Sequence, residues 1–199
     1  MTYKFEMPGL PEYYADASGL KYRQFDFYPE VVPGAPYGDA SPNPYGLSSS
    51  AWTTGISGAE NTISRNINTS ETTFVYRGYF KPDQTSDSWQ FRVRSNDGSW
   101  LWIDNDATGS TVDLNVNNAI VKNGGFHTNV EVTSDNITLL KTDDDGVDLY
   151  YAIALVGGND PGNGSLRLQF RRDGGSWQQN GAGFYYHDSR RSDGFDPAS

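Results

Sequence analysis

Residues 89–104 constrain the fold of this chain more than any other stretch, because they predict a β-hairpin with a very short connection. Bulky and polar residues alternate along 89–94, and 99–104 is again rich in aromatic and branched residues, as is typical of strands. The connection consists of Ser95, Asn96, Asp97 and Gly98. These residue types favour tight turns and bring oxygen-bearing side chains to the tip, so we look for function there first.

Short apolar runs separated by turn residues continue through the rest of the chain. No helical run of ten or more residues stands out, 14% of the residues are aromatic, and the 199 residues include 22 glycines and 10 prolines. Further strands are expected at 19–28, 72–80, 112–121, 128–140, 147–156 and 165–171, with a last ordered aromatic segment at 183–187. Segments 29–50 and 157–165 are expected to be loops. The pattern predicts one all-β domain, either a sandwich or a barrel, spanning 19–188 between a lead-in (1–18) and a polar tail (189–199).

The composition excludes several kinds of site. The chain has no cysteine, so a bound metal would be a hard cation held by oxygen, and calcium fits that constraint best. A net charge of −10 disfavours nucleic acid as a partner. Nothing approaches the length of a signal-peptide core or a membrane span, so we expect a soluble domain without membrane insertion, monomeric and part of a larger protein.

Two loops are rich in oxygen donors, the tip at Asn96 and Asp97 and the segment 159–165. In a sandwich, loops from different strands gather at one end, so together they could hold a calcium ion. Ordinary turns remain the simpler interpretation from residue chemistry alone. Phe126 and Trp177, in glycine-rich surroundings, are the candidates for stacking on a sugar face, whereas Trp89, Trp100 and Trp102 are expected in the core.

Weaker candidates favour a structural interpretation. Segments 104–106 and 143–148 are partial calcium-loop patterns that lack the terminal glutamate, and solvated turns are the expected alternative. His127 and His187 accompany no nucleophile pattern, and no carboxylate pair stands in a context suited to glycoside hydrolysis. We therefore expect no enzymatic activity.

Several of these segments, taken in order, resemble the anthrax protective-antigen-type (PA14) domain. They are Gly19-Leu20, the strand before Pro82, residues 95–99 and 101–104, Tyr150 to Ile153 before a Gly/Asn loop, and Phe184 to Tyr186. The resemblance covers about residues 19–187 and implies a β-sandwich with long loops. In lectin members of this family, two adjacent carboxylates joined by a cis peptide bond hold a calcium ion, and a second loop adds an Asn side chain and backbone carbonyls.

Carried onto this chain, the resemblance implies calcium ligands at Asn96, Asp97, Asn159, Pro161 and Asn163. Asn96 stands where those lectins have a carboxylate, which removes a charge unless Asp160 or another nearby acid restores it. Asp97, Asn159 and Asp160, with Phe126 and Trp177, would contact the ligand.

The resemblance implies a calcium-dependent lectin module, similar to the sugar-binding domain of giant repeats-in-toxin (ice-binding-type) bacterial adhesins. Such a domain is extracellular, at the cell surface, and binds cell-surface glycans through vicinal diols of fucose, glucose or mannose type. Two alternatives stay open: an accessory module of a glycoside-degrading enzyme, and a structural spacer that has lost its site.

Overall fold

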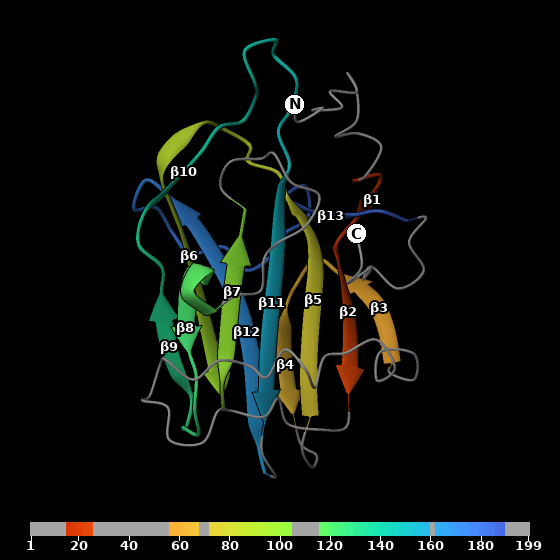
Figure 1. Cartoon of the computed structure of the whole chain (residues 1–199), viewed down its shortest axis with the longest axis vertical. Coiled ribbons are helices and arrows are strands. Elements are labelled where there is room, and N and C mark those ends of the chain that lie inside the picture. The colour runs from red at the N-terminus through yellow and green to blue at the C-terminus, as the bar shows by residue number, and fades with distance from the viewer. Residues whose placement is uncertain (1–14, 26–55, 68–71, 105–115, 160–161, 190–199) are drawn as a thin grey trace, which may run out of the picture.

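The chain folds into two antiparallel sheets packed face to face. A computed structural model describes residues 15–25, 56–67, 72–104, 116–159 and 162–189, and all statements of structure below refer to these residues. Figure 1 shows the long strands of both sheets running along the longest axis of the molecule. The prediction of an all-β sandwich is therefore confirmed.

The first sheet has eight strands among the described residues. Along its main path lie β1 (Ala17–Ser18), β13 (Tyr185–His187), β5 (Thr72–Phe80), β11 (Tyr151–Asn159), β7 (Ser99–Ile103) and β8 (Val121–Asn123), while β2 (Leu20–Phe25) pairs with β5 and with β3 (Ile56–Glu60). The second sheet has five, in the order β10 (Ile137–Leu139), β6 (Ser86–Asn96), β12 (Gly164–Arg172) and β4 (Ser64–Ile67), with β9 (Val130–Thr133) also on β6. A short 3-10 helix, η2 (Val116–Asn118), precedes β8.

Alternation along β6 decides which residues enter the core. Trp89, Phe91 and Val93 are buried, whereas Arg92 and Arg94 lie on the opposite, outer face of the second sheet. The partner strand β12 repeats the pattern, with its apolar residues inside and its arginines outside. Because side chains alternate between faces, the sequence fixes which face of this sheet packs against the first one.

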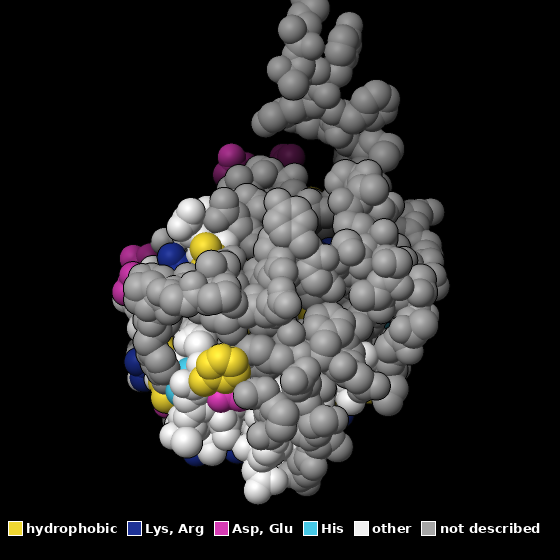
Figure 2. Space-filling view, turned by 60° about the horizontal axis from the view of Figure 1, so that its bottom comes forward, with side chains coloured by type: hydrophobic (Ala, Val, Ile, Leu, Met, Phe, Trp, Pro, Cys, Tyr) yellow, Lys and Arg dark blue, Asp and Glu magenta, His cyan; other side chains and the backbone are white. Residues whose placement is uncertain are grey.

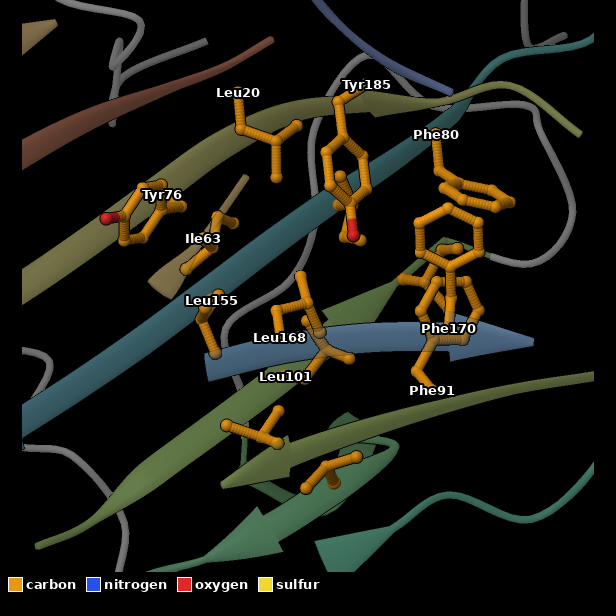
Figure 3. Packing of buried hydrophobic residues seen from close by; sticks show 14 of the residues in the cluster. Leu20, Ile63, Tyr76, Phe80, Phe91, Leu101, Leu155, Leu168, Phe170 and Tyr185 are labelled. Carbon is orange, nitrogen blue, oxygen red and sulfur yellow. The ribbon is translucent and has the colours of Figure 1, made fainter. Parts of the chain in front are cut away.

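Aromatic rings gather in one part of the core, where Figure 3 shows Phe80, Phe91 and Phe170 close together beside aliphatic side chains such as Leu101 and Leu168. Phe80 of β5 makes edge-to-face contacts with Trp89, Phe91 and Phe170, at ring-centroid distances of 5.3, 5.0 and 5.2 Å. Aromatic pairs prefer this geometry, and each adds about 0.5–1.5 kcal/mol beyond the burial of apolar area. The two sheets are thus held together near Phe80 by a cluster of rings drawn from both of them.

The inner strands of the first sheet are buried on both faces. Leu101 of β7 faces the core, and its neighbours Trp100 and Trp102 are fully buried on the other face. All nine residues of β11 are buried. The prediction that Trp89, Trp100 and Trp102 are buried is therefore confirmed.

Five expectations about the elements were wrong. The hairpin expected over 89–104 does not form, because β6 lies in the second sheet and β7 in the first, so the short connection passes from one sheet to the other. Residues 157–159 and 164, expected in a loop, belong to β11 and β12. Residues 147–150, expected to begin a strand, precede β11 instead. The strand expected at 112–121 is 3-10 helix and irregular chain over 116–120, and 105–115 lies outside the described residues. The strand expected at 128–140 is divided into β9 and β10. At the break, Ser134 N still donates to Phe91 O (2.8 Å), but Phe91 N donates to the Ser134 hydroxyl (3.0 Å) and not to its backbone carbonyl.

Candidate functional site

Three chain connections meet at one end of the sandwich, the lower end in Figure 1. They are the β6–β7 turn, the β8–β9 loop and the turn between β11 and β12. The predicted calcium ligands belong to the β6–β7 and β11–β12 turns, and Phe126, a predicted sugar contact, belongs to the β8–β9 loop. Figure 2 turns this end toward the viewer and shows only isolated hydrophobic side chains among its described residues.

The β6–β7 turn is tied directly to the end of β11. The peptide bond between Asn96 and Asp97 is cis, as the resemblance implied. Asp97 N donates to Gly158 O (3.0 Å), and Gly158 N donates to Gly98 O (2.9 Å). These two hydrogen bonds fix the backbone at Asp97 and Gly98 relative to the second candidate loop.

The β11–β12 turn supplies amide and carbonyl oxygens. Asn159 is 1% exposed, and its Nδ2 donates to Gly162 O (3.2 Å). Its Oδ1 lies 2.1 Å from the point where a Cβ on Gly164 would be, so only glycine at 164 leaves room for this oxygen. Across the gap between the turns, Asn96 Nδ2 donates to Asn163 O (2.7 Å). The structure therefore brings Asn96, Asp97, Asn159 and Asn163 together.

The β8–β9 loop completes the cluster through a residue that the sequence did not assign to it. His127 N donates to Asp97 Oδ1 (2.9 Å), and the His127 ring nitrogen Nε2 lies 3.1 Å from Asn123 O. The adjoining Phe126 is 62% exposed, the most exposed large apolar side chain among the described residues. No sequence signal connected His127 to the β6–β7 turn, because the contact uses its backbone and depends on how the loops pack.

The donor set of this cluster fits a hard cation. A calcium ion takes six to eight oxygens from carboxylates, amide and backbone carbonyls and water. The described residues could offer the Asp97 carboxylate, the side-chain oxygens of Asn96 and Asn159 and the carbonyl of Asn163. The other two predicted contacts, Asp160 and Pro161, lie outside the described residues.

Asp97 brings the only carboxylate among the described residues of the three connections, and no group of three or more His, Asp or Glu side chains suited to a metal occurs in the described parts of the chain. Asn96 Nδ2 holds the two turns together by donating a hydrogen bond to Asn163 O. An ionised carboxylate at this position has no hydrogen to donate, so it would need a cation between itself and the same carbonyl. The amide Oδ1 of the same side chain remains as a possible ligand.

Trp177, the second predicted sugar-stacking residue, lies elsewhere. Its ring packs between two guanidinium groups on the outer face of the second sheet, 4.3 Å from Arg92 Cζ and 4.4 Å from Arg171 Cζ. Cation–π contacts of this kind are stabilising. Of the two aromatic candidates, only Phe126 adjoins the cluster around Asp97.

The acidic segment 143–148 forms a turn closed by its own hydrogen bonds. Asp143 Oδ1 accepts from Asp145 N (3.0 Å) and Val147 N (2.8 Å), and Asp148 forms an ion pair with Lys81 (2.6 Å). The hydrogen bond to Asp148 raises the pKa of Lys81. In the other partial calcium loop, residues 105 and 106 lie outside the described part of the chain.

Solved structures of other proteins share the fold of this chain, although its sequence matches no known family. No protein-family model matches the sequence, and no curated protein sequence is significantly similar to it. Among solved structures, the "PA14 sugar-binding domain from RTX adhesin" superposes with a TM-score of 0.60 at 14% identity, covering 86% of this chain and 99% of that one. The PA14 domain of MpAFP antifreeze protein gives 0.59 at 11% identity, covering 85% and 90%.

A third similar structure is fungal. The epithelial adhesin 9 A domain from Candida glabrata, in complex with Galβ1-3GlcNAc, gives a TM-score of 0.59 at 15% identity, covering 90% of this chain and 93% of that one. The fold of this chain is therefore that of PA14 domains, as the sequence resemblance implied. No helix in the described part of the chain has the length and apolar character needed to cross a membrane.

Proposed function

We propose that this chain is a calcium-dependent glycan-binding domain of the adhesin type. The observation that carries the proposal is the convergence of Asn96, Asp97, Asn159 and Asn163, held by hydrogen bonds within and between two turns. Support also comes from the fold, since the similar structures include a sugar-binding domain and an adhesin domain with a bound disaccharide.

Each residue of the cluster has a distinct task in this proposal. Asp97 supplies negative charge, while the side-chain oxygens of Asn96 and Asn159 and the carbonyls of Pro161 and Asn163 supply neutral ligands. When bound, calcium would attract two neighbouring sugar hydroxyls in place of water. His127 N positions the Asp97 carboxylate by donating to Oδ1. Phe126 offers an apolar surface beside the cluster for one face of the sugar.

The proposed partners are glycans at a cell surface that carry vicinal diols, of fucose, glucose or mannose type. The disaccharide in the fungal neighbour adds galactose-type sugars to those worth testing. Binding would rest on a few ligand and hydrogen bonds with little apolar burial, so the affinity for a monosaccharide should be weak, with Kd on the order of 0.1–10 mM. An extracellular adhesin would then gain strength from many copies on one cell. We propose no catalytic role for the domain.

One observation favours a second candidate, a structural domain that needs no metal. The hydrogen bond from Asn96 Nδ2 to Asn163 O holds the two turns together by itself. In a spacer, this bond would replace the cation that a pair of carboxylates requires.

A glycan array measured with calcium and again with chelator separates the two candidates. The lectin proposal expects chelator-sensitive binding to several sugars that share a diol geometry, and methylation of either hydroxyl should remove it. An array without any calcium-dependent signal, repeated with multivalent protein, would favour the spacer. Affinity that survives both methylation and chelator would place recognition outside the Asp97 cluster.

A further inference from the structure

The outer face of the second sheet carries a cluster of arginines on a chain whose net charge is −10. β6 contributes Arg92 and Arg94, and the neighbouring strand β12 contributes Arg167 and Arg171. These positions follow the alternation that puts the apolar residues of both strands in the core, so the four side chains lie on the solvent-facing side.

Arg94 and Arg167 stand directly opposite each other in the β6–β12 register. Like charges at directly opposed positions of a sheet are destabilising. Neither guanidinium has a hydrogen-bond, ion-pair or ring partner among the described residues. Glu131 is the other cross-strand neighbour of Arg94, but its carboxylate accepts from Arg92 Nη1 (2.8 Å) instead.

The remaining arginines nearby already have partners. Arg92 Nε donates to Gln169 (2.9 Å), and Arg171 Nε donates to Gln90 (2.9 Å). Arg65 pairs with Glu60 and donates to the Tyr76 hydroxyl. The unpartnered positive charge on this face is therefore concentrated at Arg94 and Arg167.

A shallow depression of about 170 Å³ lies at this pair. The described residues that line it include no carboxylate; they are Ser64, Arg65, Asn66, Arg94, Asn129, Ser165, Leu166 and Arg167. Two unpaired guanidinium groups surrounded by hydroxyl and amide donors match an oxyanion, because the planar fork of arginine binds carboxylate and sulfate oxygens through paired hydrogen bonds.

The depression adjoins the candidate glycan site. Asn96 and Arg94 lie on the same face of β6, two residues and roughly 7 Å apart along the strand. Ser165, in the lining, is the cross-strand partner of Asn96 and is hydrogen-bonded to Asn129 of the β8–β9 loop. A saccharide held at the Asp97 cluster could therefore extend over the arginine pair.

We infer that Arg94 and Arg167 bind an anionic substituent, a carboxylate or a sulfate ester, of an acidic saccharide. The assignment of the saccharide rests on the proposed glycan-binding function, whereas the oxyanion site stands on the arginine pair alone. An anion at this position would also relieve the repulsion between the two guanidinium groups.

The first experiment tests the oxyanion site without any sugar. Sulfate is titrated against chloride at constant ionic strength while the Nε–Hε signals of the arginines are followed by NMR. We expect saturable shifts at Arg94 and Arg167 that persist in chelator and in Asp97→Asn. Linear shifts spread over all exposed arginines would overturn the site, whatever happens to the calcium proposal.

The second experiment tests the ligand class. Calorimetry with calcium compares a neutral methyl glycoside with its uronate and its sulfate ester, the latter two showing which anionic group the site prefers. We expect the wild-type domain to bind the acidic ligands more tightly than the neutral one. In the double variant Arg94→Gln/Arg167→Gln, the affinity for the acidic ligands should fall by about tenfold or more, while the affinity for the neutral glycoside is unchanged. The matched control is Arg171→Gln, which removes a charge from the same face outside the depression.

Three results would contradict the inference. The wild-type domain could bind neutral and acidic ligands equally, the double variant could keep the preference, or Arg171→Gln could lose as much of it as the double variant does. If no sugar binds at all, the proposed function fails, and the sulfate titration still decides whether the arginine pair is an anion site.

Discussion

Replacing Asp97 by Asn should abolish calcium binding without disturbing the fold. Asp97 is 9% exposed, and its Oδ1 accepts a hydrogen bond from His127 N. An amide oxygen can accept the same bond, so Asp97→Asn removes the charge and keeps the shape. Alanine would also leave the His127 N–H without this acceptor, which makes it a less selective test.

The expected size of the effect follows from mass action. Extracellular calcium modules bind with Kd of about 0.1–1 mM, so 10 mM calcium would stabilise the wild-type domain by about 1.4–2.7 kcal/mol. For a domain of this size each kcal/mol raises Tm by about 2–4 °C, so the expected shift is about 3–11 °C. Asp97→Asn should show a shift below about 1 °C.

Scanning calorimetry in 10 mM calcium and in chelator measures this directly. Asp143→Asn is the matched control, because Asp143 Oδ1 also accepts backbone hydrogen bonds in a turn. It should keep the full calcium response. The reasoning would be refuted by a wild-type Tm that ignores calcium, or by an Asp97→Asn variant that responds as strongly as the wild type.

Four further outcomes are expected. Gly164→Ala should displace the buried Asn159 amide, lower stability by about 1–3 kcal/mol and remove the calcium response in the same calorimetric assay. Phe126→Ala should weaken sugar binding severalfold in titrations but change stability by less than about 0.5 kcal/mol, and an unchanged affinity would exclude stacking. The Tyr185 hydroxyl finds no hydrogen-bond partner among the described residues, so Tyr185→Phe should add about 1 kcal/mol of stability at pH 7. Burial also raises the pKa of Tyr185, so above about pH 10 the phenol ionises in the unfolded chain first and the domain loses stability; Tyr185→Phe should flatten this alkaline loss in urea titrations. Incubation of the purified domain with a glycan panel should release no reducing sugar, and reproducible release would establish an activity that we do not expect.

The sequence was most informative where local chemistry and packing agree. β6 ends and β7 begins close to where the alternation of 89–94 and the turn residues 95–98 predicted two strands and a short connection, although the connection joins the two sheets and is not a hairpin. The same logic failed at Gly157, because a glycine in a strand was taken as a loop signal. A Cβ there would lie 2.6 Å from Leu166 Cδ1, so glycine at 157 allows β11 and β12 to approach closely. Such a requirement arises only between sheets and leaves no trace in local pattern.

Strands β3 and β4 could not be predicted from the local sequence pattern. Their residues, ISGAE and SRNI, have little apolar alternation, and they form strands because β2 and β12 offer edges to pair with. In the candidate site, residue types and the family resemblance indicated Asn96, Asp97 and Asn159. The contribution of His127 and the opposition of Arg94 to Arg167 depend on tertiary packing and strand register, which a single sequence does not reveal.

The pairing of β1 with β13 determines how the domain would carry load. Ala17 lies opposite His187, and β13 joins β5 at Phe80, whereas the turn at Asn159 faces the other end of β5 at Thr72. Eight residues of strand, roughly 26 Å, separate the two ends. In a longer polypeptide, tension between a bound surface glycan and the flanking chain would run lengthwise along β5 and β11 and shear nine paired positions at once. Tension between the two flanking segments alone would instead act on β1 and β13, which meet at only two positions, and would leave the binding end unloaded.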